Sequence, residues 1–395
     1  MAWLGNHKQE AQSRVGLILA GGGARAAYQV GVMKAIARMR APAVANPFPI
    51  LCGTSAGAIN ATALAIYSRD FQNAVSRLVS VWGNFTVDKV FRSDFWGIAR
   101  SGAHWFAALM LGGMLGRYNP SSLFDRTPLQ QLLARTMPFE QIAMAIEAGH
   151  LHALSVTASG YTSGQSVTFY QSAAKIDPWD RAIRVGCPAD IGIDHLMASS
   201  AIPFLFEAIK INREYFGDGS MRQIAPISPA LHLGASKLLV IGVRGSDDEG
   251  NERETAAEYP SMAQIAGHAL NSIFLDSMEV DLERLQRINR TLQLVPKKHV
   301  ADGTVSLKPV ETLVISPSRD ISHIAQQHAH HLPRTVRYFL RGLGALNREG
   351  TSLLSYLLFE KAFCRELIAL GYADTIKRRD EIMAFLPEAG PDMSV

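Results

Sequence analysis

Two short apolar runs, each followed by a turn of small residues and then a helical pattern, limit the fold of this chain most strongly. The first run, residues 15–20, ends in three glycines, after which apolar residues recur at helical spacing. The second run, residues 49–52, is followed by the small-residue turn 53–57 and an alanine-rich helical stretch, 58–67. Two successive strand-turn-helix units predict a parallel sheet covered by helices.

The rest of the chain extends this pattern. Further short apolar runs predict strands at residues 151–158, 167–170, 208–211, 238–243 and 310–315, with helical patterns between most of them. A long helix is expected at 261–294, and the pattern from residue 332 onward is helical. We therefore expect an α/β fold: a three-layer α/β/α sandwich with a mainly parallel central sheet and a C-terminal helical extension.

The same pattern suggests a division into three parts. Residues 15–245 would form the core, residues 246–330 the remainder of the α/β domain, and residues 331–395 the helical extension. A hydrophobic content of 48% in 395 residues, with 19% charged residues, suits a folded chain with a large core.

The charge balance is mildly basic. A formal net charge of +4 could favour an anionic membrane surface, or it could belong to an ordinary slightly basic protein. It is too weak to indicate a nucleic-acid partner.

The cysteines and the N-terminus bear on the compartment. Cys52, Cys187 and Cys364 lie far apart and in no metal-ligand spacing, so neither a disulfide framework nor a metal site is predicted. Residues 1–14 contain no continuous apolar stretch, and the longest apolar run, 105–115, is too short to span a bilayer. We expect a cytoplasmic protein, soluble or bound peripherally at the inner face of the membrane.

The turn at residues 53–57 is a G-x-S-x-G pentapeptide between an expected strand and helix, the context of a nucleophile elbow. Gly53 and Gly57 suit a turn too tight for Cβ atoms, and Ser55 would stand at a helix N-terminus, where the helix dipole favours negative charge. A glycine-rich turn that merely contains a serine is the alternative. The strand-turn-helix context favours the nucleophile.

The three glycines after the first strand could hold the other half of such a site. The backbone N–H groups of Gly21, Gly22 and Gly23 could converge on the oxyanion that forms when an ester carbonyl is attacked. Arg25 would add positive charge nearby or orient the loop.

The same glycine-rich stretch could instead belong to a nucleotide-binding site. It fits the dinucleotide fingerprint, with Ala26 in the last position, but that fingerprint needs an acidic residue about twenty positions later. Residues 11–69 contain no Asp or Glu, and no Lys-Ser or Lys-Thr follows the glycines as a phosphate loop requires. No cofactor is therefore expected.

A serine nucleophile needs a base, and a histidine held by a carboxylate is the usual choice. No histidine in the chain lies in a setting that marks it as catalytic; those considered are His195, His232, His268, His299 and His323. Asp218, between an aromatic-glycine run and Gly219, stands out instead, although an Asp-Gly turn between strands is a common arrangement.

Taken together, G-G-G-A-R at 21–25, G-T-S-A-G at 53–57 and D-G at 218–219 resemble the patatin-like phospholipase family, which is related to cytosolic phospholipase A2. The resemblance extends over about residues 15–243, with 198–203 before the D-G and 226–235 after it in the family's order. It implies an oxyanion loop at Gly21 to Gly23, Ser55 as nucleophile, Asp218 as base, no histidine and no metal. Residues 15–245 would then be the catalytic core.

Three positions depart from the family's usual pattern. Ala26 stands where glycine is frequent, Ser220 follows the D-G where glycine or alanine is usual, and Gln223 lies in a stretch that lacks the family's asparagine before proline. The first two substitutes are small, which is compatible with catalysis.

Two segments could meet a lipid surface. Residues 96–118 are apolar, with aromatic residues at intervals, and suit either a lid over a lipid-binding cleft or a segment buried under the sheet. Residues 332–346 form a basic amphipathic pattern that could lie on an anionic membrane or pack its apolar face on the core.

The expected function is a serine lipid acyl hydrolase that cleaves fatty acyl esters of phospholipids or lysophospholipids through an acyl-serine intermediate. An α/β-hydrolase esterase with a Ser-Asp-His triad and a non-catalytic lipid-binding module are the alternatives.

Overall fold

The computed structural model of the protein describes residues 14–42, 44–92, 122–245, 259–296, 307–347 and 350–386. The apolar segment 96–118 lies outside these ranges. Among the described residues, no helix has both the length and the apolar content needed to cross a bilayer.

A ten-stranded sheet forms the centre of the molecule, with β10-β9-β1-β2-β3-β4-β6-β5 as its main order. The pairs from β10 to β3 are parallel, whereas β4 and β8 both pair antiparallel with β3. The strands are β1 Val15–Leu19, β2 Ile50–Thr54, β3 Ala153–Gly160, β4 Ser166–Ser172, β5 Asp180–Arg181, β6 Arg184–Pro188, β7 Ile209–Ile211, β8 Glu214–Asp218, β9 Lys237–Ile241 and β10 Glu311–Ile315.

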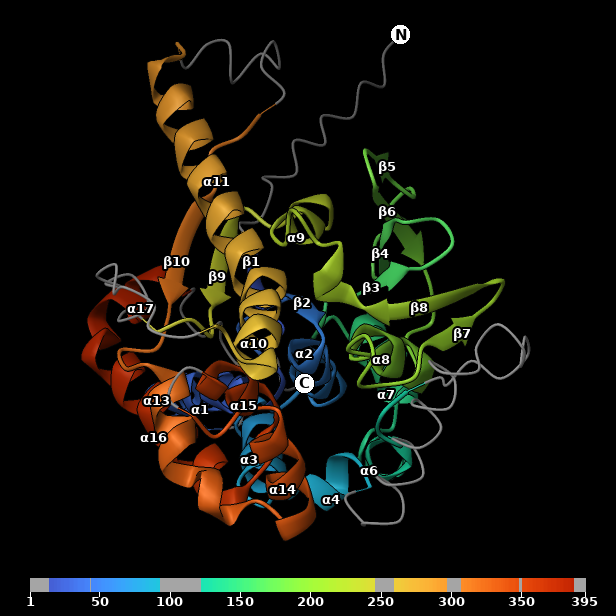
Figure 1. Ribbon diagram of the computed structural model, residues 1–395. Coiled ribbons are helices and arrows are strands. Elements are labelled where there is room, and N and C mark those ends of the chain that lie inside the picture. The colour runs from blue at the N-terminus through green and yellow to red at the C-terminus, as the bar shows by residue number, and fades with distance from the viewer. Residues whose placement is uncertain are drawn as a thin grey trace, which may run out of the picture.

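Helices cover both faces of this sheet (Figure 1). The helices that form the two layers and the C-terminal part include α1 Ala27–Met39, α2 Ala56–Ile66, α3 Phe71–Trp82, α6 Thr127–Thr136, α8 Ile193–Ser199, α9 Ser228–His232, α10 Met262–Asn271, α11 Ser277–Leu294, α13 Ile321–His328, α14 Arg334–Gly342, α15 Thr351–Leu357 and α16 Lys361–Lys377. The others are α4 Val87–Val90, α7 Glu140–Glu147 and α17 Arg379–Phe385, and the short helical turns are η1 Gly23–Ala26, η2 Gly219–Met221 and η5 Ala329–His331.

The alternation of side chains along the strands explains the three layers. In β1, Leu17 and Leu19 belong to the large core shared with α1, α2 and α3, whereas Ile18 faces the smaller core shared with α9 and α11. Because the central strands are buried on both faces, their sequences are mainly apolar, although β3 also buries Ser155, Thr157 and Ser159. The expected α/β fold with a mainly parallel sheet and C-terminal helices is confirmed.

The C-terminal helices pack tightly against the first helix. A Cβ atom on Gly31 would overlap the carbonyl oxygen of Ile368, and one on Gly371 would overlap that of Tyr28, so α1 and α16 approach closely at glycines. The hydroxyl of Tyr28 also donates to the Asp374 carboxylate at 3.2 Å. The three-part division at residues 245 and 330 remains a prediction.

The long helix expected at 261–294 is present as α10 and α11, joined by a π-helical turn at Ser272–Asp276. Such turns are frequent near functional sites. Here the turn places the buried Phe274 beside the glycine loop that follows β1.

Candidate active site

Ser55 occupies a strained turn between β2 and α2. Its backbone angles, φ 54° and ψ −129°, lie in a region that residues with a Cβ atom rarely adopt, and its side chain is buried. The backbone N–H of Ser55 donates to the hydroxyl of Ser199 at 2.9 Å, and that hydroxyl donates to the carbonyl of Thr157 at 2.6 Å. The surrounding structure thus holds the strained conformation in place.

The flanking glycines are required by close backbone packing. A Cβ atom on Gly53 would lie 2.5 Å from the carbonyl oxygen of Gly57, across the turn itself. A Cβ atom on Gly57 would overlap the carbonyl oxygens of Leu19 and Ala20. The end of β1 therefore passes directly against the first turn of α2, which brings the glycine loop to Ser55.

Asp218, the last residue of β8, is fully buried and faces Ser55. The Ser55 hydroxyl donates to Asp218 Oδ2 at 2.6 Å, and the Ser220 N–H donates to Oδ1 at 2.9 Å. A Cβ atom on Gly219 would overlap the Thr157 carbonyl oxygen, so the chain can turn beside β3 only with glycine after Asp218.

The electrostatic environment of Asp218 balances opposing effects. Burial raises the pKa of the Asp218 carboxyl group to about 6, while hydrogen bonds from Ser55 and Ser220 and the charge of Arg126 lower it. A carboxylate with this pKa is ionised at neutral pH and still basic enough to accept a proton. In turn, burial and the Asp218 charge raise the pKa of Tyr161.

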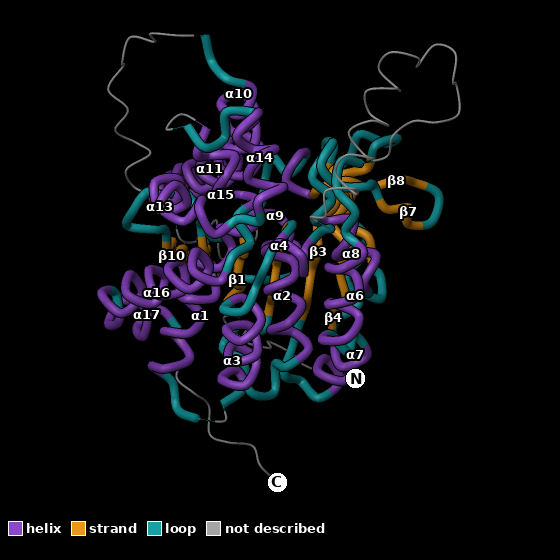
Figure 2. Tube along the Cα trace, turned by 60° about the horizontal axis from the view of Figure 1, so that its bottom comes forward, coloured by secondary structure: helices purple, strands orange, loops and turns teal. Residues whose placement is uncertain are grey.

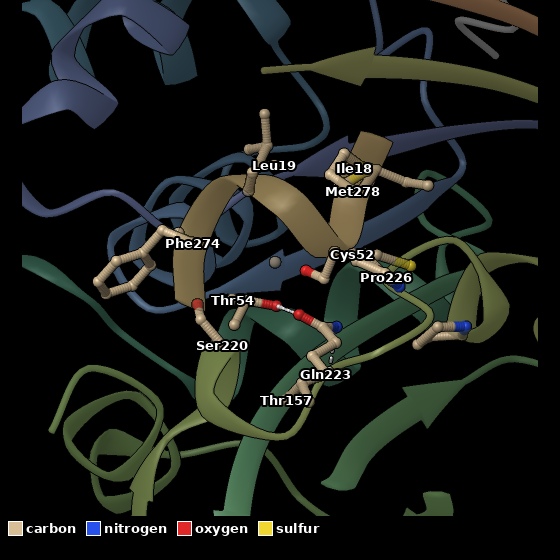
Figure 3. Close-up of a pocket in the computed structure, with 15 residues that line it drawn as sticks. Ile18, Leu19, Cys52, Thr54, Thr157, Ser220, Gln223, Pro226, Phe274 and Met278 are labelled. Carbon is tan, nitrogen blue, oxygen red and sulfur yellow. Dashed lines mark hydrogen bonds between the residues drawn. The ribbon is translucent and has the colours of Figure 1, made fainter. Parts of the chain in front are cut away.

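A second hydrogen-bonded group fixes the turn from the side of the D-G motif. Thr54 donates to the Gln223 side chain at 2.6 Å, and Gln223 donates to the Thr157 hydroxyl at 3.2 Å. Figure 3 draws these side chains at the small cavity. Gln223 thus takes part in locating the residue before Ser55. The cavity that these side chains line, about 10 Å³ in volume, holds about one water and no acyl chain.

The glycine loop is anchored by buried amides. The Gln29 side chain donates to the Ala20 carbonyl at 2.7 Å, and Asn60 of α2 donates to Gln29 at 2.9 Å. Gly22 is the N-cap residue of the short helix η1, and Gly23 adopts φ +54° against the Tyr356 carbonyl, where a Cβ atom would overlap it. Gly21 passes close to Ser220 and Phe274, and all three residues line the small cavity.

Arg25 points toward the C-terminal helices. Its guanidinium donates to the hydroxyls of Ser355, Ser322 and Ser352 at 2.8, 3.0 and 3.3 Å, and it lies 4.3 Å above the Tyr356 ring. These contacts occupy its side chain, so they favour loop orientation over the alternative of adding charge at the oxyanion.

Replacing Arg25 by Met should lower the free energy of unfolding by about 2 kcal/mol, because buried hydroxyls lose a charged donor. Chemical denaturation followed by circular dichroism would measure the loss. The exposed Arg69 offers a matched control, since Arg69→Met should change stability by less than about 0.5 kcal/mol. Equal stability of the Arg25→Met protein and wild type would contradict this role.

The sequence patterns missed two residues next to the site. Arg126, at the start of α6, is buried and donates to the carbonyls of Met197 and Glu207 and to the Ser200 hydroxyl at 3.0, 2.9 and 3.2 Å. Ser199, described above, is the other. No motif marks Arg126, and Ser199 lies in the 198–203 stretch of the family resemblance without being singled out there, because the partners of both residues lie far away along the chain.

Histidines and metal ligands take no part in this arrangement within the described residues. None of the described histidines hydrogen-bonds to Ser55 or Asp218, and His195 instead accepts from the Gly192 N–H and packs on Phe169. His299 lies outside the described residues. Among the residues that the structure describes, no three His, Cys, Asp or Glu side chains are grouped to hold a metal ion.

Comparison with known proteins gives two findings. The family model described as patatin-like phospholipase matches residues 17–231. Among solved structures, the chain is similar to full-length ExoU of the type III secretion system of Pseudomonas aeruginosa, solved in complex with full-length SpcU. That match has 13% identity and a TM-score of 0.25, and covers 94% of this chain and 79% of the other. No curated protein matches the chain.

Proposed function

Because the chain belongs to the patatin-like phospholipase family, we propose that it is a serine lipid acyl hydrolase with Ser55 as nucleophile and Asp218 as base. Its substrates would be fatty acyl esters of phospholipids or lysophospholipids. The observation that carries the roles of the two residues is the 2.6 Å hydrogen bond from the Ser55 hydroxyl to the buried Asp218 carboxylate.

The proposed reaction runs in two halves. Ser55 Oγ attacks the ester carbonyl as its proton passes to Asp218, and the same proton then leaves with the alcohol, which departs as the lysolipid. Water deprotonated by Asp218 next attacks the acyl-serine. The Ser55–acyl bond breaks as Asp218 returns this proton to Ser55 Oγ, and free fatty acid is released.

The negative charge that develops on the carbonyl oxygen needs donors. Backbone N–H groups of the loop at Gly21 to Gly23 are the proposed donors, supported by the close passage of the end of β1 over the first turn of α2. The first N–H groups of α2 lie at the helix N-terminus and therefore have no acceptor within that helix. Together with the helix dipole they favour negative charge at this end. Donors of this kind are typically worth about 3 kcal/mol each.

The proposal is tested with purified protein and mixed phospholipid vesicles in the presence of a calcium chelator. Mass spectrometry should detect free fatty acid from the wild type and none from the Ser55→Ala protein. A fluorophosphonate probe, which reacts with activated serines, should label Ser55. Absence of both fatty acid release and labelling would reject hydrolysis and favour the non-catalytic lipid-binding alternative.

The raised pKa of Asp218 predicts the pH dependence of the reaction. A base acts only when deprotonated, so kcat/KM should fall as the pH drops below about 6 and level off above it. Initial rates with a soluble short-chain ester between about pH 4 and 8 would measure this fall, the acid limb of the pH profile. A profile that stays flat to about pH 4.5 would indicate a base with an ordinary carboxyl pKa.

The cytoplasmic location stays a prediction.

A further inference from the structure

Helix α14 buries the apolar side that its sequence pattern predicted. Leu332, Val336 and Leu340 are almost fully buried, and Phe339 contacts the Phe124 ring. Of the two alternatives for this segment, packing on the core is therefore favoured for the apolar face. The opposite side of α14 faces outward, where Arg334, Tyr338 and Arg341 are exposed.

Helix α10 continues this outward face. The Ala263 N–H donates to the Leu343 carbonyl at 3.0 Å, which joins the start of α10 to the end of α14. Around this junction, Tyr259, Met262 and Ile265 are 90%, 68% and 46% exposed, and Tyr338 on α14 is 82% exposed. Large apolar side chains with this exposure, on two helices that are joined at this junction, indicate an interaction surface. We call the six residues Tyr259, Met262, Ile265, Arg334, Tyr338 and Arg341 the α10–α14 face.

The two segments that carry this face, residues 259–275 and 321–347, contain arginines but no carboxylates. Helix α14 contributes three arginines. Among the described residues, no carboxylate forms an ion pair with Arg334, Arg337 or Arg341, although surface arginines elsewhere pair, as Arg287 does with Glu283 and Arg378 with Glu381. An anionic surface would supply the missing counter-charge.

The face lies over the same layer that covers the glycine loop. A Cβ atom on Gly267 of α10 would contact Ser352 and Leu353 of α15, and α15 in turn holds Arg25 and the loop at Gly23. Figure 2 shows α10, α14 and α15 gathered on one side of the molecule. A surface bound there would therefore lie at the end of the sheet where the glycine loop and Ser55 are found.

We propose that the α10–α14 face docks the protein on a bilayer rich in anionic phospholipids. Its arginines lie against the charged headgroups, while Tyr338, Tyr259 and Met262 enter the interfacial region. The role of this docking in delivering lipid to the site rests on the proposed function.

The test measures sedimentation with phosphatidylcholine vesicles that contain or lack phosphatidylglycerol. The wild type should bind the mixed vesicles and be released by high salt. The double variant Arg334→Gln/Arg341→Gln should bind about 10-fold more weakly, and Tyr338→Ser/Met262→Ser should also weaken binding. The matched control Arg284→Gln/Arg290→Gln lies on α11, which runs away from α10 to the far end of the molecule (Figure 1), and should bind as the wild type does.

Point substitutions are preferred to truncation because the C-terminal helices pack on α1 and bond Arg25. Hydrolysis of a soluble ester by the docking variants should equal that of the wild type, which separates loss of docking from loss of the site. Equal vesicle binding by the Arg334→Gln/Arg341→Gln protein and the control would overturn the proposal. So would wild-type binding that does not depend on phosphatidylglycerol. If vesicle binding behaves as expected but no variant or wild type hydrolyses any ester, the proposed function fails and the docking surface stands.

Discussion

Replacing Asp218 by Asn should lower kcat/KM for a soluble ester by about 10³-fold, because Asn can accept the Ser55 hydrogen bond but not its proton. The side chains have nearly the same shape, so the buried pocket keeps its packing. Initial-rate kinetics with the purified proteins would measure the loss. Activity of the Asp218→Asn protein within about 10-fold of wild type would exclude Asp218 as the base.

A histidine control separates this mechanism from a Ser-Asp-His triad. His195→Gln should retain activity close to that of wild type, since His195 contacts Gly192 and Phe169 and not Ser55. A loss near 10³-fold on His195→Gln, with Asp218→Asn still active, would favour the triad alternative.

The substitution Asp218→Asn should not destabilise the fold at neutral pH. Because burial raises the pKa of Asp218 above its ordinary value, the stability that this carboxyl contributes is greatest below about pH 4 and is lost as the pH rises through about 6. At pH 7 the wild type therefore carries a buried anion that the Asn variant lacks. Thermal unfolding of Asp218→Asn should occur at or above the wild-type temperature at pH 7, with the difference shrinking as the pH falls below 6.

The turn that contains Ser55 was predictable from sequence because its constraints are local. Gly53, Ser55 and Gly57 lie within five residues between two periodic patterns, and the backbone contacts that require glycine arise within the same strand-turn-helix unit or from the adjacent β1. The fold class followed from the same pattern, since strands buried on both faces are read as short, mainly apolar runs.

The remainder of the site depends on distant contacts that no local pattern records. Asp218 ends a strand, β8, that sequence periodicity did not indicate, because it is short and its first two residues are not buried. Its role came from a family resemblance. Arg126 carries no motif, and Ser199 lies in the 198–203 stretch of the family resemblance without being marked there as a site residue. Each acquires its importance only when α6 and α8 pack beside the sheet.

Arg126 connects to both Ser55 and Asp218 through one segment of chain. Its bonds to Met197, Ser200 and Glu207 hold the segment that contains Ser199, which accepts the Ser55 N–H. The same segment supplies the Ala201 carbonyl, which accepts the Asp218 N–H at 2.8 Å. Arg126 also lowers the pKa of Asp218 by its charge, while its own pKa is lowered to about 10, mainly by burial.

Replacing Arg126 by Gln should therefore have two separable effects. Loosening of residues 197–207 should lower kcat by about 10²-fold, since small misplacements of reacting groups are costly. Loss of the positive charge should raise the pKa of Asp218, so the acid limb of the kcat/KM profile should move to higher pH. The other groups that influence Asp218, namely Ser55, Ser220 and Tyr161, are unchanged in this variant.

Arg126→Lys provides the control that separates charge from geometry. Lysine keeps the positive charge but cannot reproduce the three directed hydrogen bonds, so kcat should fall while the acid limb stays near its wild-type position. Glu207 also influences the pKa of Arg126 and is present in both variants, so it does not distinguish them. If the Gln and Lys proteins lose activity equally and share the wild-type pH profile, Arg126 acts only through packing. An acid limb that moves to higher pH in the Gln protein alone would establish that the charge of Arg126 helps to keep Asp218 ionised.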